Sequence, residues 1–119
     1  MNLPERISTA NADHYAWGEH CDGWHLVRTP ALSVIQERMP PESSEARHFH
    51  ERARQFFFVL AGEAVLEIDG CDHCLHEQQG CEVAPGMAHQ IFNRGDVDLH
   101  FLVISQPPSH GDRILAANA

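Results

Sequence analysis

The amino-acid sequence predicts one all-β domain, a sandwich or barrel of short strands, and three observations carry this prediction. The 119 residues suit a single domain with a single core, and 43% hydrophobic and 21% charged residues are ordinary for a globular chain. Glycine, proline and Asx residues interrupt the chain at short intervals and leave pieces of strand length. No window keeps a convincing apolar period of 3.6 residues, so long amphipathic helices are not expected.

The pieces between these interruptions have the composition of strands, because β-branched and aromatic residues dominate them. The clearest are residues 32–36 (LSVIQ), 56–60 (FFFVL), 64–68 (AVLEI) and 99–104 (LHFLVI). Asp69–Gly70 predicts a tight hairpin between 64–68 and a strand near 73–76. The tail, 113–119, is too short for more than a turn or two of helix. No repeat or linker divides the chain, so 1–119 is expected to be one domain.

Two of these pieces, 56–60 and 99–104, are almost continuously apolar, which indicates that both faces of each strand are covered. One face would pack inside the domain. A chain of this size has little material of its own for the other face, so we expect a second copy to cover it in a homodimer.

Charge and composition exclude several classes of function. Eight basic against 17 acidic residues give a net charge of −9, so nucleic acid and anionic membranes are not expected partners. Lysine is absent, which excludes Schiff-base chemistry. The chain has no apolar run long enough to span a bilayer, and its first residues lack the apolar core of a signal peptide. We therefore expect a cytoplasmic protein whose four cysteines are reduced.

The ten histidines include a pattern that predicts a metal site. His48 and His50 are two apart on an expected strand, so their imidazoles share one face and form a bidentate clamp for a first-row metal. Gln55 opens the next strand and could add a side-chain oxygen. His89 follows a Pro85–Gly86 turn, and local spacing alone does not bring it to the other three.

These segments together resemble the two motifs of the cupin superfamily. The first reads Gly, five residues, His-x-His, three or four residues, Glu, six residues, Gly. His48, His50 and Gly62 fit it, while Gln55 replaces the glutamate and Glu42 the first glycine. The second reads Gly, five residues, Pro-x-Gly, two residues, His, three residues, Asn. Gly86, His89 and Asn93 fit it, while Gln78 and Ala84 stand in place of its first glycine and proline.

The resemblance implies a cupin jelly-roll (double-stranded β-helix) barrel over about 32–105, with His48, His50, Gln55 and His89 binding one divalent transition metal, which could be Ni, Zn, Mn or Fe. Because Gln55 is neutral, the protein would leave the +2 charge uncompensated and favour an anionic small molecule on the metal. The cupins that linearise unsaturated uronates have a similar ligand set of His-x-His, Gln and His.

The function remains open among three alternatives: a metal-dependent enzyme for isomerisation or enolisation of a small polar or anionic molecule, a non-catalytic cupin that binds or senses a small ligand, and a metal-dependent dioxygenase. No general base can be identified, and Glu51 and Glu82 are candidates by position only. Arg52 and Arg54 could bind a substrate anion, against the alternative of a solvated loop.

Other residues with possible roles have plainer interpretations. Cys71 and Cys74, with His76 close by, could suggest zinc, but a second Cys-x-x-Cys is missing, and a hairpin with two reduced thiols is the better interpretation. Phe49 should face away from the metal ligands, as should Arg47. In cupins an N-terminal strand often crosses to the partner subunit, so the resemblance implies interface roles for three aromatic residues, Tyr15, Trp17 and Trp24.

Overall fold

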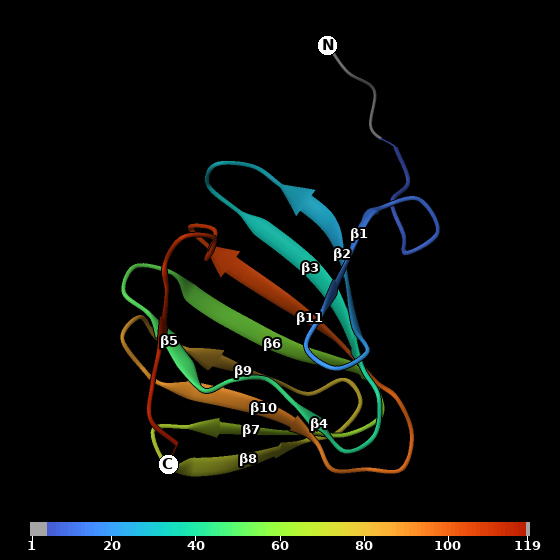
Figure 1. Cartoon of the computed structure of the whole chain (residues 1–119). Coiled ribbons are helices and arrows are strands. Elements are labelled where there is room, and N and C mark those ends of the chain that lie inside the picture. Colours follow the sequence, from blue (N-terminus) through green and yellow to red (C-terminus); the bar gives the residue numbers. More distant parts are fainter. Residues whose placement is uncertain (1–4, 119) are drawn as a thin grey trace.

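Two antiparallel sheets face each other in the computed structural model, which describes residues 5–118 (Figure 1). One sheet has the strand order β1-β2-β3-β11-β6-β9, and the other has the order β12-β5-β10-β7-β8 with β4 paired to β10. The strands are β1 (Asp13–Trp17), β2 (Cys21–Arg28), β3 (Ser33–Met39), β4 (Ser43–Ser44), β5 (His48–His50), β6 (Arg54–Ala61), β7 (Ala64–Ile68), β8 (Cys71–Leu75), β9 (Gly80–Val83), β10 (His89–Asn93), β11 (Leu99–Gln106) and β12 (Arg113–Leu115). The prediction of an all-β jelly-roll barrel is therefore confirmed. The described residues include no helix that is long and apolar enough to cross a membrane.

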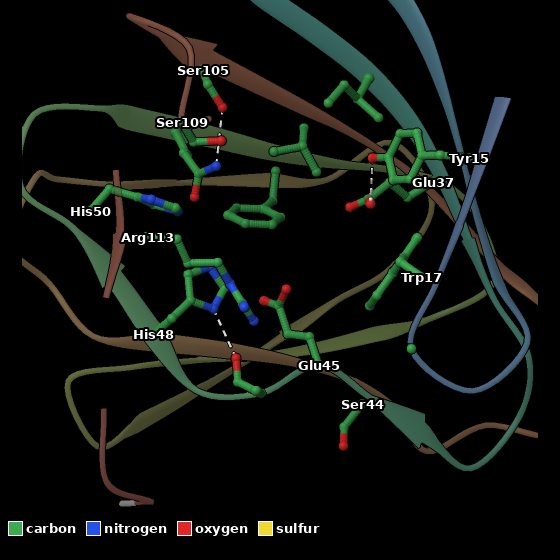
Figure 2. A pocket seen from close by; sticks show the side chains of 16 residues that line it. Tyr15, Trp17, Glu37, Ser44, Glu45, His48, His50, Ser105, Ser109 and Arg113 are labelled. Atoms are coloured by element: carbon green, nitrogen blue, oxygen red, sulfur yellow. Dashed lines mark hydrogen bonds between the residues drawn. The ribbon is translucent and has the colours of Figure 1, made fainter. Parts of the chain in front are cut away.

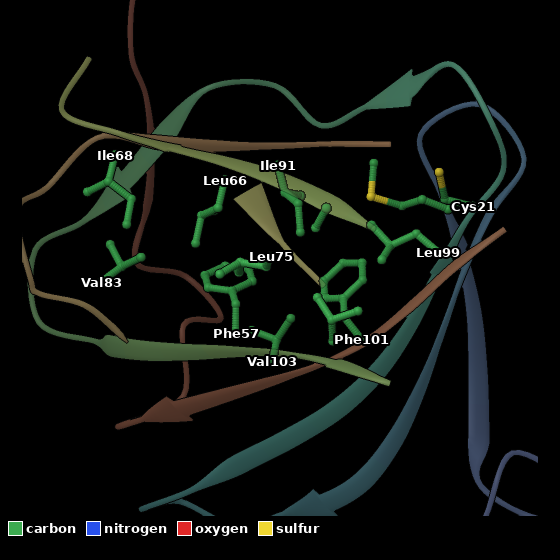
Figure 3. Packing of buried hydrophobic residues seen from close by; sticks show 13 residues of the cluster. Cys21, Phe57, Leu66, Ile68, Leu75, Val83, Ile91, Leu99, Phe101 and Val103 are labelled. Atoms are coloured by element: carbon green, nitrogen blue, oxygen red, sulfur yellow. The ribbon is translucent and has the colours of Figure 1, made fainter. Parts of the chain in front are cut away.

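The core lies between the sheets, where alternate residues of each strand point inward (Figure 3). Phe57 of β6 and Phe101 of β11 stack with their ring centroids 6.2 Å apart. Leu66 of β7 and Ile91 of β10 are fully buried in the facing sheet. Burial of such side chains is worth about 1.5–3 kcal/mol each. The packed core between the sheets is therefore a stable scaffold for the open end of the barrel.

The hairpin at Asp69–Gly70 forms as predicted. Ile68 pairs with Cys71, so the loop has two residues, and both adopt positive φ (51° and 88°), as a type I′ turn requires. The second strand begins at Cys71, slightly earlier than expected.

The C-terminal tail contains a strand, which the sequence did not indicate. Residues Arg113–Leu115 form β12, which pairs with β5 in the register Arg113–His50 and Leu115–His48. This pairing joins segments more than sixty residues apart, and no local pattern in the tail announces it. Its consequence is that β5 is held on both sides, by β10 and by β12.

Gly62, the last residue of the first motif, is required by space as well as by conformation. Its φ is +85°, and a Cβ atom at this position would lie 2.6 Å from the carbonyl oxygen of Asp98. Only glycine accepts both conditions without strain. The motif glycine therefore serves the turn between β6 and β7 rather than the histidines.

The outer face of β6 and β11 is apolar and is not covered by this chain. Phe56 is 37% exposed, and its ring stacks on that of Phe58 with centroids 6.1 Å apart. Leu102 and Ile104 of β11 are half-buried on the same outer side. The sequence predicts that both faces of these strands are covered. Within this chain, only the inner face is covered.

Candidate metal centre

Three histidines converge at the open end of the barrel. His48 and His50 project from the same face of β5, and His89 opens β10 directly opposite His48 in the β5–β10 pair. Their nitrogen ligand atoms all lie within 4.8 Å of one another, and all three side chains are buried. The turn before His89 is tied to β5, because the Gly86 amide donates to the His50 carbonyl. This contact supplies the link that local sequence spacing could not provide.

Each of these imidazoles uses Nδ1 in a hydrogen bond with a backbone carbonyl. The acceptors are Ala46 for His48 (2.8 Å), Asp112 for His50 (3.0 Å) and Met87 for His89 (3.0 Å). A neutral imidazole that donates from Nδ1 presents a lone pair at Nε2, so the three rings are set as Nε2 ligands.

Burial keeps the three rings neutral. It lowers the pKa of His48 to about 3, and it also lowers the pKa values of His50 and His89. The Nε2 atom of His50 is buried without a hydrogen-bond partner among the described residues. A buried polar atom without a partner is costly, and a metal ion would satisfy it. The donor set therefore fits a divalent first-row transition metal.

Gln55 reaches this group from the opposite sheet. Its Oε1 lies 3.1 Å from Nε2 of His89, and its Nε2 donates to the Ser105 hydroxyl at 3.0 Å. With His89 protonated at Nδ1, a nitrogen lone pair and an amide oxygen face each other. A cation at this point would be a partner for both.

A cavity of about 470 Å³ opens from the histidines toward β1 and β3 (Figure 2). Its wall contains two carboxyl groups, those of Glu37 on β3 and Glu45 in the segment before β5. Tyr15 of β1 donates a hydrogen bond of 3.0 Å to Glu37, whereas Oε1 of Glu45 is buried and has no partner among the described residues. Arg113 of β12 also lines the cavity.

Desolvation raises the pKa of Glu37 to about 7 and that of Glu45 to about 8, and the charge of Glu37 adds to the shift of Glu45. Glu45 is therefore mostly protonated at neutral pH. A cavity lined by imidazole lone pairs and by carboxyl groups that titrate near neutrality can bind a cation and exchange protons with a bound molecule.

Several residues singled out in the sequence lie elsewhere. Glu51 and Glu82, the candidates for a general base, are exposed and do not line the cavity, so Glu37 and Glu45 take their place. Tyr15 and Trp17, for which the resemblance implies interface roles, line the cavity of their own chain.

The arginines near the histidines in sequence also lie outside the cavity. Arg54 points outward, 4.0 Å from Glu82, and Arg52 borders a second hollow beside the cavity. Arg47 pairs with Glu67 at 2.7 Å, on the side of β5 away from the cavity. Arg113 and the two glutamates gave no sequence signal because the strands that bring them here are distant along the chain.

Cys71, Cys74 and His76 do not gather into a second site. Both cysteines are exposed on β8, and within residues 5–118 only the three histidines form a cluster of metal-ligand geometry. Zinc binding by this hairpin is therefore not supported.

Comparisons with known proteins identify the family. The cupin domain model matches residues 35–105, and the chain belongs to the cupin family. It is 34% identical over 105 residues to the oxalate-binding protein of Thermotoga maritima, which covers 85% of this chain and 84% of that protein.

Solved structures show the same fold. A predicted oxalate decarboxylase from Thermotoga maritima superimposes with a TM-score of 0.80 at 23% identity over 87% of this chain and 100% of that one. KdgF from Halomonas sp. gives 0.81 at 16% identity over 89% and 96%, and an RmlC-like cupin from Shewanella frigidimarina gives 0.80 at 16% identity over 91% and 96%. At these identities the structures establish the fold.

Proposed function

We propose that this protein is a metal-dependent enzyme that isomerises or enolises a small anionic molecule on one divalent transition metal held by His48, His50, His89 and Gln55. The observation that carries the proposal is the common orientation of the three imidazoles, each anchored through Nδ1 to a backbone carbonyl with its Nε2 left to face a metal. When bound, the ion would supply Lewis acidity that polarises a carboxylate or carbonyl of the ligand. Nickel, zinc, manganese and iron all suit these nitrogen and oxygen donors.

The charge balance of the site favours an anion. All four proposed ligands are neutral, so the ion keeps its full charge toward the cavity. Arg113 lines the same cavity and makes no ion pair with any described residue, which leaves its guanidinium free to orient a carboxylate.

Glu45 is the residue that we assign to proton transfer. Its carboxyl group faces the same cavity as the histidines, and its Oε1 has no protein partner (Figure 2). With a pKa of about 8, it can donate a proton near neutral pH and take one back, as an enolisation requires. Glu37 is held by Tyr15, and its charge would help to keep Glu45 protonated by raising the pKa of that carboxyl group.

A second candidate function is reversible binding without turnover. It is favoured by the Thermotoga maritima relative, whose name is that of an oxalate-binding protein. Oxalate has no carbon-bound hydrogen, so a site built only to hold such a dianion would not need the proton-transfer group.

Two measurements test these alternatives. Elemental analysis of protein purified without a metal-affinity tag should find about one transition metal per chain, and H48A/H50A should lose it, while the matched H73A/H76A control keeps it. Metal-loaded protein in D₂O should then exchange carbon-bound hydrogen of a 2-keto acid or hydroxy ketone, followed by NMR. Binding of oxalate with no exchange in any such compound would favour the non-catalytic function.

We also propose that the protein is a cytoplasmic homodimer. The homodimer is supported by the apolar outer face of β6 and β11, which includes Phe56 at 37% exposure. A surface of this kind is typical of a subunit interface.

A further inference from the structure

Arginines in this chain divide into two groups. Four are within 4.0 Å of a carboxylate: Arg38 with Asp22, Arg47 with Glu67, Arg54 with Glu82 and Arg94 with Asp72. Four others, Arg6, Arg28, Arg52 and Arg113, make no ion pair with any described residue. In a chain with 17 acidic and eight basic residues, partners are plentiful, so the position of the unpaired arginines is informative.

Three of these four arginines border two neighbouring hollows, whereas Arg6 lies in the exposed segment before β1. Arg113 lines the cavity that opens from the histidines, which we call the metal cavity. Arg28 and Arg52 line a second hollow of about 690 Å³. His25 and His110 complete the polar wall of the second hollow, and no aspartate or glutamate lines it. We call it the basic hollow. The basic hollow is therefore a positively charged place on a chain whose overall charge is negative.

The basic hollow adjoins the metal cavity. Tyr15, Ile35 and Ser109 line both spaces, so they form a shared border. Figure 2 shows Tyr15 and Ser109 along one side of the metal cavity and Glu45 and His48 along the other. A molecule held at the histidines would therefore extend past Tyr15 and Ser109 into the basic hollow.

His25 adds an unused hydrogen-bonding atom to this wall. Its Nδ1 is buried without a partner among the described residues, and its ring lies against Tyr15 with centroids 5.1 Å apart. Asp13 is opposite His25 in the β1–β2 pair, but it does not line the hollow. His25 therefore lines the same hollow as two guanidinium groups without ion pairs, and all three side chains can donate hydrogen bonds to an oxyanion.

We propose that the basic hollow binds a second anionic group, a phosphate or a carboxylate, of the same molecule whose first anionic group lies at the metal. This inference rests on the proposed function for the position of the first group. It makes the ligand a molecule with two anionic ends, and Arg28 and Arg52 are the residues that select for the distal one. Arginine suits both oxyanions because its planar guanidinium can donate two parallel hydrogen bonds.

A series of three probes on one carbon skeleton tests the proposal: gluconate, with one anionic end, and glucarate and 6-phosphogluconate, which add a carboxylate or a phosphate at the other end. Calorimetry on the metal-loaded protein should show that at least one of the two doubly anionic probes binds about tenfold or more tightly than gluconate. R28Q/R52Q should abolish this preference, because it should weaken binding of the doubly anionic probe far more than binding of gluconate. The matched control, R54Q/R94Q, removes two exposed arginines elsewhere and should retain the preference. The doubly anionic probe that binds more tightly than gluconate identifies the distal group as a carboxylate or a phosphate.

The probes also separate this proposal from the proposed function. If the protein holds no metal and gluconate does not bind, inorganic phosphate titrated into the purified protein still compares wild type with R28Q/R52Q. Weaker phosphate binding by the variant would then support the hollow as an anion site. Equal phosphate affinity in the two proteins would overturn the proposal. So would equal affinity of wild type for all three sugar acids, because a bridging ligand must gain from its second anionic group.

Discussion

The Nε2 atom of His89 lies 3.1 Å from Oε1 of Gln55, and this contact joins the two sheets across the open end of the barrel. His89 begins β10 in one sheet, and Gln55 is near the start of β6 in the other. The opposite end of the Gln55 amide donates to Ser105, its neighbour on β11, which fixes the direction of the oxygen. The amide is therefore part of the histidine cluster rather than a bystander, and its replacement is a sensitive probe of the site.

Replacing Gln55 with glutamate should raise metal affinity by about tenfold or more, because a carboxylate is a better donor than an amide for a borderline cation. Turnover of an anionic ligand should fall, since the added charge offsets part of the Lewis acidity. Competition with a chelator measures the first effect, and the NMR exchange assay measures the second. Gln106→Glu, at an exposed position of β11, is the matched control. Unchanged metal affinity in Q55E would remove Gln55 from the ligand set.

The carboxyl pair in the cavity should make the metal-free protein less stable as pH rises. Glu45 has a pKa of about 8 in the folded state and about 4.5 when unfolded, so the folded protein binds more protons between these values. Its contribution to stability is present below about pH 4.5 and is lost as pH rises through 8. Glu45→Gln removes this loss, so its unfolding free energy should fall less between pH 6 and 9, by on the order of 1–2 kcal/mol.

Thermal or urea unfolding at several pH values measures that difference, with Glu51→Gln as a control at an exposed position. The buried histidines act in the opposite direction. The pKa of His48 is lowered to about 3, so stability is lost as pH falls below its unfolded value near 6.5. A pH profile in E45Q as steep as that of wild type would contradict the buried position of this carboxyl group.

Asp112 should support the metal site without touching the metal. Its carboxylate accepts hydrogen bonds from the amides of Glu51, Arg52 and Ala53 at 2.9–3.1 Å, and these bonds lower its pKa. Its carbonyl accepts from His50. D112A should lower the melting temperature by roughly 5 °C or more and weaken metal binding, because three loop amides lose their acceptor and His50 is less well held.

Calorimetry of the metal-free and loaded forms measures both effects. Asp96→Ala, in the loop between β10 and β11, is a suitable control for loss of an acidic residue. Wild-type metal affinity in D112A would show that His50 is positioned by β5 and β10 alone.

The proposed ligand set was accessible from sequence, but the rest of the cavity was not. His48 and His50 are two apart on a strand, and Gln55 and His89 stand at the spacings of a family motif, so short-range pattern and resemblance sufficed. Tyr15 and Glu37 meet through the pairing of β1 with β2 and of β2 with β3. Arg113 arrives through the β5–β12 pair.

Such long-range contacts depend on topology, and each of these residues has an ordinary local context. The same reason explains why the sequence pointed to Glu51 and not to Glu45 as a candidate general base. Glu51 is next to a proposed ligand in sequence yet exposed, whereas Glu45 points into the cavity from the segment before β5.

The outer face of β6 and β11 provides the last test. If it is the interface of a homodimer, light scattering after size exclusion should give about twice the mass of one chain. Phe58→Glu places a charge in the middle of this face, next to Phe56, and should yield a monomer that remains folded, because residue 58 points away from the core. Val97→Glu introduces the same charge at a residue that is 59% exposed in a loop, and it should stay dimeric. A monomeric wild type, or a dimeric F58E, would show that another surface or none joins the subunits.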